Sequence, residues 1–173
     1  MSQSVPPSGN PFADGSAPAV PAPAPAPARS GNVVLGIVAG VVAALAGAAA
    51  YGGLMRAMAD EDGSYTEIGF VALGVGALVG FALGKVGGRN PLLPVLGVPL
   101  ALAGVFLGQL FGYALMISWW SAASGEAVTA TELLTSHIGD LVEAWKEEAG
   151  AMSLLFFAIA GYEGFAITKK VAA

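Results

Sequence analysis

The feature that most constrains this chain is the stretch from Asn32 to Met55, which contains no charged side chain. A helix needs about 20 consecutive apolar residues to cross the hydrocarbon core of a bilayer, and this stretch is long enough. Charged residues make up 11% of the whole chain, whereas soluble domains carry about 25%. So few charges cannot cover a water-exposed surface, and we therefore expect an integral membrane protein.

Three further segments have the length and apolar character of spanning helices. The second is bounded by Glu67 and Lys85, and Asn90 with Pro91 has the residue types of a helix start before the third. The predicted spans are about 33–55, 68–84, 94–118 and 149–168. We therefore predict an all-α fold, in which residues 33–173 form a four-helix transmembrane bundle with an amphipathic helix on its outer side.

The first span has one alternative interpretation, a cleaved signal peptide with its small-residue site at Ala48-Ala49-Ala50. The apolar stretch is too long for such a peptide, and the region before it is long and nearly uncharged. We therefore favour a spanning helix.

Residues 1–32 form a tail that contains most of the prolines and ends in alternating Pro and Ala from Pro21 to Ala28. This alternation favours polyproline II, and the segment has too little apolar bulk to offset its ordering entropy. We predict a disordered cytoplasmic tail that acts as a spacer. A ligand for a proline-recognising partner is the alternative, but no strong aromatic or basic flank accompanies the repeat.

The distribution of basic residues predicts the orientation. If four spans alternate, one side receives Arg29, Lys85, Arg89, Lys169 and Lys170, and the other receives only Arg56, Lys146 and most of the acids. Basic residues are enriched in cytoplasmic loops. Both termini are therefore predicted to be cytoplasmic, in the inner cell membrane.

The connection from residue 119 to 148 should contain an amphipathic helix over about 130–148. Thr129 and Glu132 have capping-box spacing, and apolar residues recur at helical intervals up to Trp145. This helix lies along the outer surface or over the bundle mouth, as a lid, a partner-docking element or a simple connector. Trp119, Trp120 and Trp145 are predicted interface anchors.

The single histidine, His137, lies in this helix with Asp140 and Glu143 near the same face. Two carboxylates and a histidine could bind an ion weakly, but a solvated helical surface explains the trio at least as well. The same histidine could act as a pH sensor. We predict no metal site and no cofactor.

Glycines at spacing of four mark one face of three spans. They are Gly36 and Gly40, then Gly76, Gly80 and Gly84, then Gly104, Gly108 and Gly112. Without side chains they let another helix backbone approach closely. We predict that spans two and three pack as a pair joined by the turn at residues 87–90. The faces could instead contact another subunit.

Two polar positions lie inside the spans, Gln109 in the third and Glu163 in the fourth. Ionisable residues in spans are functional candidates by default. Lys85, at the inner end of the second span, is a plausible partner for Glu163, and Lys170 shares its helical face but lies about 10 Å away. An amide can bond across helices without a transport role.

The segment Tyr65-Thr-Glu-Ile-Gly-Phe-Val-Ala-Leu-Gly-Val-Gly-Ala-Leu-Val-Gly80 resembles the second span of a group of small bacterial membrane proteins. That span reads as an acid, Ile-Gly, Ala, Gly-x-Gly and Leu-Val-Gly. Some members carry an N-terminal zinc ribbon, which this cysteine-free chain lacks. The resemblance implies the multi-pass topology and no mechanism.

The residues favour a non-enzymatic accessory or scaffold protein that acts through helix association with other membrane proteins or a second copy of the chain. No nucleophile–base pair or phosphate loop stands out, and the net charge of -5 argues against nucleic acid. The alternative is a small transporter or channel that uses Glu163 and Gln109.

Overall fold

The structure is a computed structural model that describes residues 31–60 and 69–172. These residues form six helices and no strand. The helices are α1 (Val33–Ala57), α2 (Gly69–Gly87), α3 (Leu92–Ala123), α4 (Ala130–Ser136), α5 (Ile138–Glu148) and α6 (Ala151–Ala172). The predicted all-α fold is confirmed. The tail predicted to be disordered lies outside the described residues, apart from Gly31 and Asn32.

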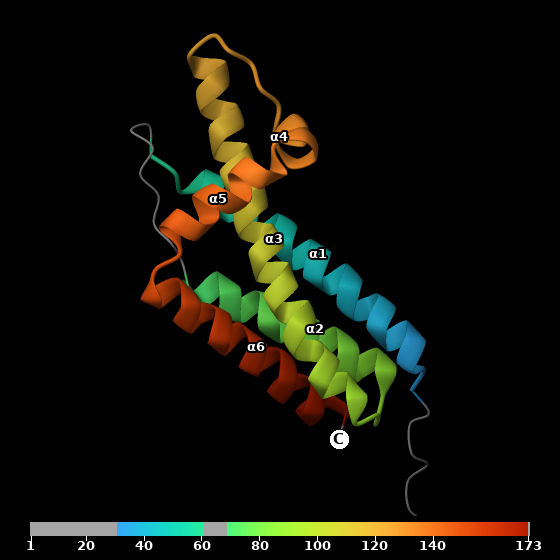
Figure 1. The fold of residues 1–173 in the computed structure, drawn as a ribbon. Helices are drawn as coiled ribbons and strands as arrows, with labels where there is room; N and C mark the ends of the chain where they lie inside the picture. Colours follow the sequence, from blue (N-terminus) through green and yellow to red (C-terminus); the bar gives the residue numbers. More distant parts are fainter. Residues whose placement is uncertain (1–30, 61–68, 173) are drawn as a thin grey trace, which may run out of the picture.

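The four long helices α1, α2, α3 and α6 form a bundle (Figure 1). Each is long enough and apolar enough to cross a bilayer, so the chain is a multi-pass membrane protein with the four predicted spans. Several boundaries differ from the prediction. Helix α2 continues to Gly87, α3 to Ala123 and α6 to Ala172, while Ile68 lies outside the described residues. A helix can continue into the headgroup region because its backbone hydrogen bonds are internal.

The outer surface of the bundle is apolar, as lipid contact requires. Phe70 is 81% exposed, and Val34 is 68% exposed. Helix α1 alone exposes Val34, Leu35, Val38, Val41, Val42 and Leu45 along its outer side. An apolar surface of this extent on a soluble monomer would be an aggregation site. The exposed face is therefore the lipid face.

The order of the helices around the bundle corrects one prediction. Helix α2 packs along α6, and α3 packs along α1, whereas α2 and α3 meet less extensively across the bundle diagonal. Since the chain reverses direction at each connection, the two extensive contacts join parallel helices. The predicted glycine pairing of spans two and three is wrong. Their short connection makes them antiparallel, but the two helices lie diagonally opposite each other, and the small residues of α2 face α6.

The connection between α2 and α3 is a tight turn. Gly88 has a φ of 70°, which L side chains rarely adopt. The Asn90 side chain accepts a hydrogen bond from the Leu92 N–H at 2.9 Å, and Pro91 is already in the helical region with a φ of -65°. The helix start predicted at Asn90 and Pro91 is therefore confirmed.

Helices α4 and α5 form a cap over one end of the bundle (Figure 1). The Thr129 hydroxyl accepts from the Glu132 N–H at 3.1 Å, which confirms the predicted start of the amphipathic segment. The single helix predicted over residues 130–148 is wrong, because the chain leaves helical geometry at His137, with φ -121° and ψ 24°. An apolar side chain is buried on each side of this break, Leu133 at 8% and Leu141 at 1% exposure.

Candidate functional site

The aromatic side chain of Trp145 attaches the cap to the bundle. It comes from α5 and lies against Phe106 of α3 and Phe157 of α6, with ring centroids 5.0 Å and 5.8 Å away. Both contacts are edge-on, the arrangement that aromatic quadrupoles favour. These contacts place Trp145 between two spanning helices, and its predicted role as an interface anchor stays a prediction.

Gln109 is the polar centre beneath this cap. Its Oε1 accepts from Trp145 Nε1–H at 2.6 Å, and its Nε2–H donates to the Tyr51 hydroxyl at 3.3 Å. The residue is only 4% exposed. One amide therefore joins α1, α3 and α5, and no buried side-chain nitrogen or oxygen in the described part of the chain lacks a hydrogen-bond partner. Hydrogen bonds between helices are a sufficient reason for a buried amide at this position.

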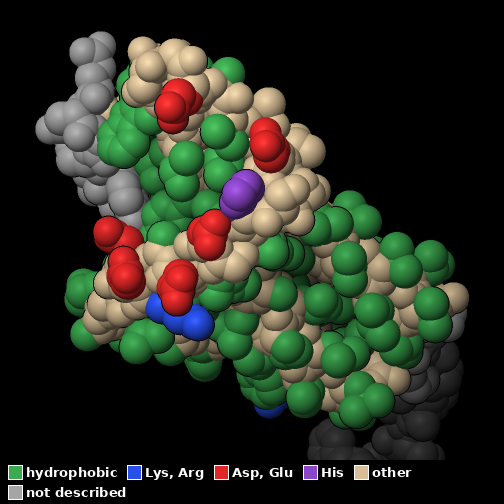
Figure 2. Space-filling view, turned by 45° about the horizontal axis from the view of Figure 1, so that its top comes forward, with side chains coloured by type: hydrophobic (Ala, Val, Ile, Leu, Met, Phe, Trp, Pro, Cys, Tyr) green, Lys and Arg blue, Asp and Glu red, His purple; other side chains and the backbone are tan. Residues whose placement is uncertain are grey.

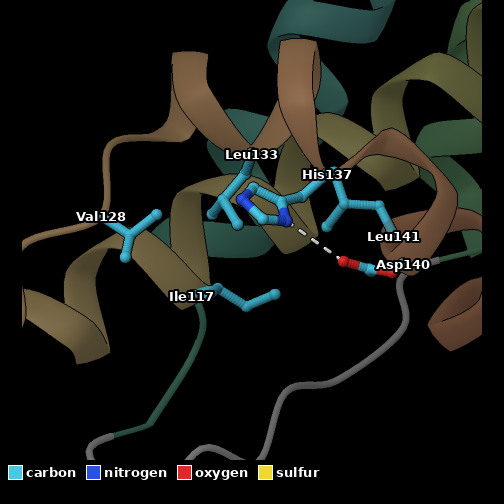
Figure 3. A pocket seen from close by; sticks show the side chains of 6 residues that line it. All are labelled: Ile117, Val128, Leu133, His137, Asp140 and Leu141. Atoms are coloured by element: carbon cyan, nitrogen blue, oxygen red, sulfur yellow. Dashed lines mark hydrogen bonds and ion pairs between the residues drawn. The ribbon is translucent and has the colours of Figure 1, made fainter.

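A pocket of about 210 Å³ opens between α3 and the cap (Figure 3). It is lined by Ile117, Val128, Leu133, His137, Asp140 and Leu141. Four of the lining side chains are aliphatic, and the His137 imidazole and the Asp140 carboxylate are the two polar groups beside them (Figure 3). The combination of apolar walls and a few convergent polar groups is typical of binding sites.

The two polar side chains that line the pocket, His137 and Asp140, form an exposed pair. His137 Nδ1 lies 3.2 Å from Asp140 Oδ2, and the two side chains are 49% and 80% exposed. The described residues contain no group of three potential metal-binding side chains. Glu143, the third member of the possible ion site in the sequence, is therefore not brought to this pair.

The surface around the pocket is acidic. Figure 2 shows carboxylates gathered over the end of the molecule that carries α4 and α5. The exposed acids of this region are Glu126, Glu132, Asp140, Glu143, Glu147 and Glu148. Lys146 is the one basic residue between positions 124 and 150. We call α4, α5 and the connection before α4 the outer cap, which is an acidic surface with an apolar pocket.

The other two predicted anchors lie near the end of α3. The Arg56 guanidinium is 4.0 Å from the centroid of the Trp119 ring, a cation–π contact that links α1 to α3. Trp120 is 40% exposed. Their role as interface anchors stays a prediction.

The predicted glycines of α2 form the contact with α6. A Cβ atom on Gly76 would collide with the Ala160 carbonyl oxygen, and one on Gly80 would lie 3.0 Å from the Gly164 oxygen. One on Gly84 would lie 2.8 Å from the Thr168 oxygen. The contact thus advances four residues at a time on both helices, which is the geometry that lets parallel backbones pack closely.

The predicted glycines of α3 form the corresponding contact with α1. A Cβ atom on Gly104 would lie 3.2 Å from the Ala44 oxygen of α1 and also 2.9 Å from Val75 Cγ1 of α2. One on Gly108 would lie 3.2 Å from Ala48 Cα, and one on Gly112 would meet Met55. Of the predicted glycines in α1, Gly36 packs against Gly87 and Gly40 against Leu83 and Leu100. All eight predicted glycines therefore pack within this chain.

The sequence analysis missed the partners on α6, namely Ala160, Gly164 and Thr168. These residues are also four apart, and all are buried. The signal was present, because small-xxx-small contacts use Ala, Ser and Thr as well as Gly.

The two intramembrane polar positions do not meet. Gly164, next to Glu163, packs against Gly97 of α3. Gln109 lies twelve residues beyond Gly97, which corresponds to about 18 Å along the helix. Glu163 is half-buried and forms no ion pair with another described residue, including Lys85 and Lys170.

No protein-family model, no curated protein and no solved structure matches this chain. The resemblance to small bacterial membrane proteins stays a prediction. Function has therefore to be inferred from the geometry of the chain itself.

Proposed function

We propose that this chain is a non-enzymatic accessory or scaffold protein of the cytoplasmic membrane, and that it binds another membrane protein or a second copy of itself through the outer cap. The single observation that carries this proposal is the open apolar pocket of about 210 Å³ in the cap. Pockets of this kind on an otherwise charged surface are suited to an inserted apolar side chain.

Because the glycine faces are covered within the chain, the cap is the surface that is left for a protein partner. All eight predicted glycines contact helices of the same chain, so they are not the docking faces. The remaining surface of the bundle is aliphatic and aromatic and suits lipid. The cap combines apolar walls with charged rims, which is the composition of a protein interface.

The polar network supports a structural role beneath the cap. Gln109 donates a hydrogen bond to Tyr51 and accepts one from Trp145, and these bonds connect three helices. An amide, a phenol and an indole used in this way fix the position of α5. The cap is therefore held as a rigid surface, which reduces the ordering cost of binding a partner.

The charges of the described residues support the proposed orientation. Lys85, Arg89, Lys169 and Lys170 lie at the end of the bundle opposite the cap, and Arg56 and Lys146 lie at the cap end. The positive-inside bias places the cap outside and both termini in the cytoplasm.

A photo-crosslinking residue at position 137 tests the proposal in intact membranes. We expect a discrete adduct, either at twice the mass of the chain or with one protein partner. Position 38 on α1, where Val38 is 52% exposed on the lipid face, is the matched control and should give no discrete adduct. Ile117→Trp fills the pocket and should lower the adduct yield without changing thermal stability.

A negative result would be equally clear. A strict monomer in mild detergent, together with no discrete adduct from position 137, would contradict the proposal. An adduct that is unchanged by Ile117→Trp would remove the pocket from it.

A further inference from the structure

The end of the bundle opposite the cap brings lysines of α2 and α6 together. A Cβ atom on Gly84 would lie 2.8 Å from the Thr168 oxygen and 3.0 Å from Val171 Cβ. Lys85 follows Gly84, and Lys169 and Lys170 lie between Thr168 and Val171. All three lysines are therefore within one helical turn of the same interhelical contact.

Helical phase places two of these lysines on the same side of the α2–α6 pair. Each residue turns a helix by about 100°. Lys85 is one step after Gly84, which faces α6, and Lys170 is one step before Val171, which faces α2. Because the two helices are parallel, a forward step on one and a backward step on the other lead to the same side. Lys169 is turned away from α2 by the same reasoning.

Among the described residues, none compensates the positive charge at this end with an ion pair. Lys85, Lys169, Lys170 and Arg89 are all exposed, and none forms an ion pair with a described residue. Of the described acids, only Glu163 lies in this half of the bundle. It is seven residues from Lys170, or about 10 Å along α6. Two ammonium groups on the same side of a helix pair, without a counter-charge among the described residues, attract an anion.

The surroundings of the two lysines are those of a lipid rather than a soluble anion. Phe81 precedes Lys85 by one helical turn on the same face and is 52% exposed on the apolar surface. A ligand here would meet ammonium groups at the end of the spanning helices and an aromatic ring further in. A phospholipid presents its phosphate and its acyl chain in this order. Basic sites between membrane helices commonly hold such headgroups.

We propose that the α2–α6 pair binds one anionic phospholipid. Lys85 and Lys170 hold the headgroup phosphate, and Phe81 lies beside the first part of an acyl chain. This site is independent of the outer cap and of any protein partner. It does not depend on which side of the membrane the cap faces.

Native mass spectrometry of the full chain in a neutral detergent tests this site. The protein is titrated with phosphatidylglycerol or with phosphatidylcholine of the same acyl chains. We expect preferential retention of phosphatidylglycerol. Lys85→Gln with Lys170→Gln should weaken this retention about 25-fold, since each of the two basic groups near a membrane surface contributes about fivefold. Lys85→Arg with Lys170→Arg should retain it.

The matched control is Arg89→Gln with Lys169→Gln, which removes the same number of charges from the same end of the bundle. It should leave retention within about twofold, because Lys169 is turned away from α2 and Arg89 lies in the turn after the end of α2. Equal weakening by the two double variants would overturn the proposal, since diffuse surface charge would then explain the binding. Equal retention of the two lipids, or displacement by millimolar inorganic phosphate, would also overturn it.

Discussion

At the scale of single residues, Gln109 shows how a membrane protein uses a buried polar group. Its amide is 4% exposed and connects Tyr51 of α1 to Trp145 of the outer cap. In lipid, a polar group without a hydrogen-bond partner is costly. The amide of Gln109 therefore also provides the partner that the Tyr51 hydroxyl and the Trp145 indole need. The indole of Trp145 can therefore be buried against the bundle because Gln109 Oε1 accepts its hydrogen bond.

A double-mutant cycle on Gln109 and Trp145 measures this bond. Gln109→Leu should destabilise the protein by about 1–2 kcal/mol, because it leaves the indole N–H without its acceptor. Trp145→Phe keeps an aromatic ring between Phe106 and Phe157 but removes the donor. Unfolding in mixed micelles should show a coupling free energy of at least about 0.5 kcal/mol. Additive losses would mean that the hydrogen bond contributes nothing.

At the scale of helices, association depends on where small residues lie and not only on how many there are. Helix α2 contains glycines on two faces. Gly76 packs against the backbone of α6, whereas a Cβ atom on Gly74 would meet nothing within 4 Å. The hydrophobic effect does not drive helices together in lipid, so close backbone contact has to hold α2 to α6.

This difference gives a matched pair of substitutions in one helix. Gly76→Ala should destabilise the bundle by about 1–3 kcal/mol, because the new methyl group would collide with the Ala160 carbonyl oxygen. Gly74→Ala should change stability by less than about 1 kcal/mol, and in the favourable direction if alanine's helix propensity dominates. Unfolding of both variants in mixed micelles provides the measurement. Equal effects would show that the α2–α6 contact is not as close as described.

At the scale of the whole molecule, charge is segregated between the two ends. The acids lie mainly on the outer cap, and four of the described basic residues lie at the opposite end. The two ends should therefore face different compartments, with the basic end in the cytoplasm.

Cysteine labelling can determine this orientation, because the chain contains no natural cysteine. We expect Ser136→Cys in the outer cap to react with a membrane-impermeant maleimide in intact cells. Lys169→Cys at the opposite end should react only after the cells are permeabilised. Both sites are exposed, so access to the reagent decides the result. The reverse pattern would invert the proposed topology.

The sequence by itself determined the number of spans, the helix start at Asn90 and the existence of an amphipathic outer segment. Each of these depends on local properties, namely the length of an apolar run, capping chemistry and helical periodicity. The glycines were also visible in the sequence, since spacing of four is a local pattern.

Only the tertiary structure decided which helices those glycines join. Spacing places residues on one face of a helix but does not say which helix covers that face. The glycines of α2 were predicted to pack against α3, whereas the structure packs them against α6. The meeting of Gln109 with Trp145, the break at His137 and the pocket beside it likewise depend on contacts between distant residues. Local propensity cannot specify such contacts, because they arise only when the helices pack.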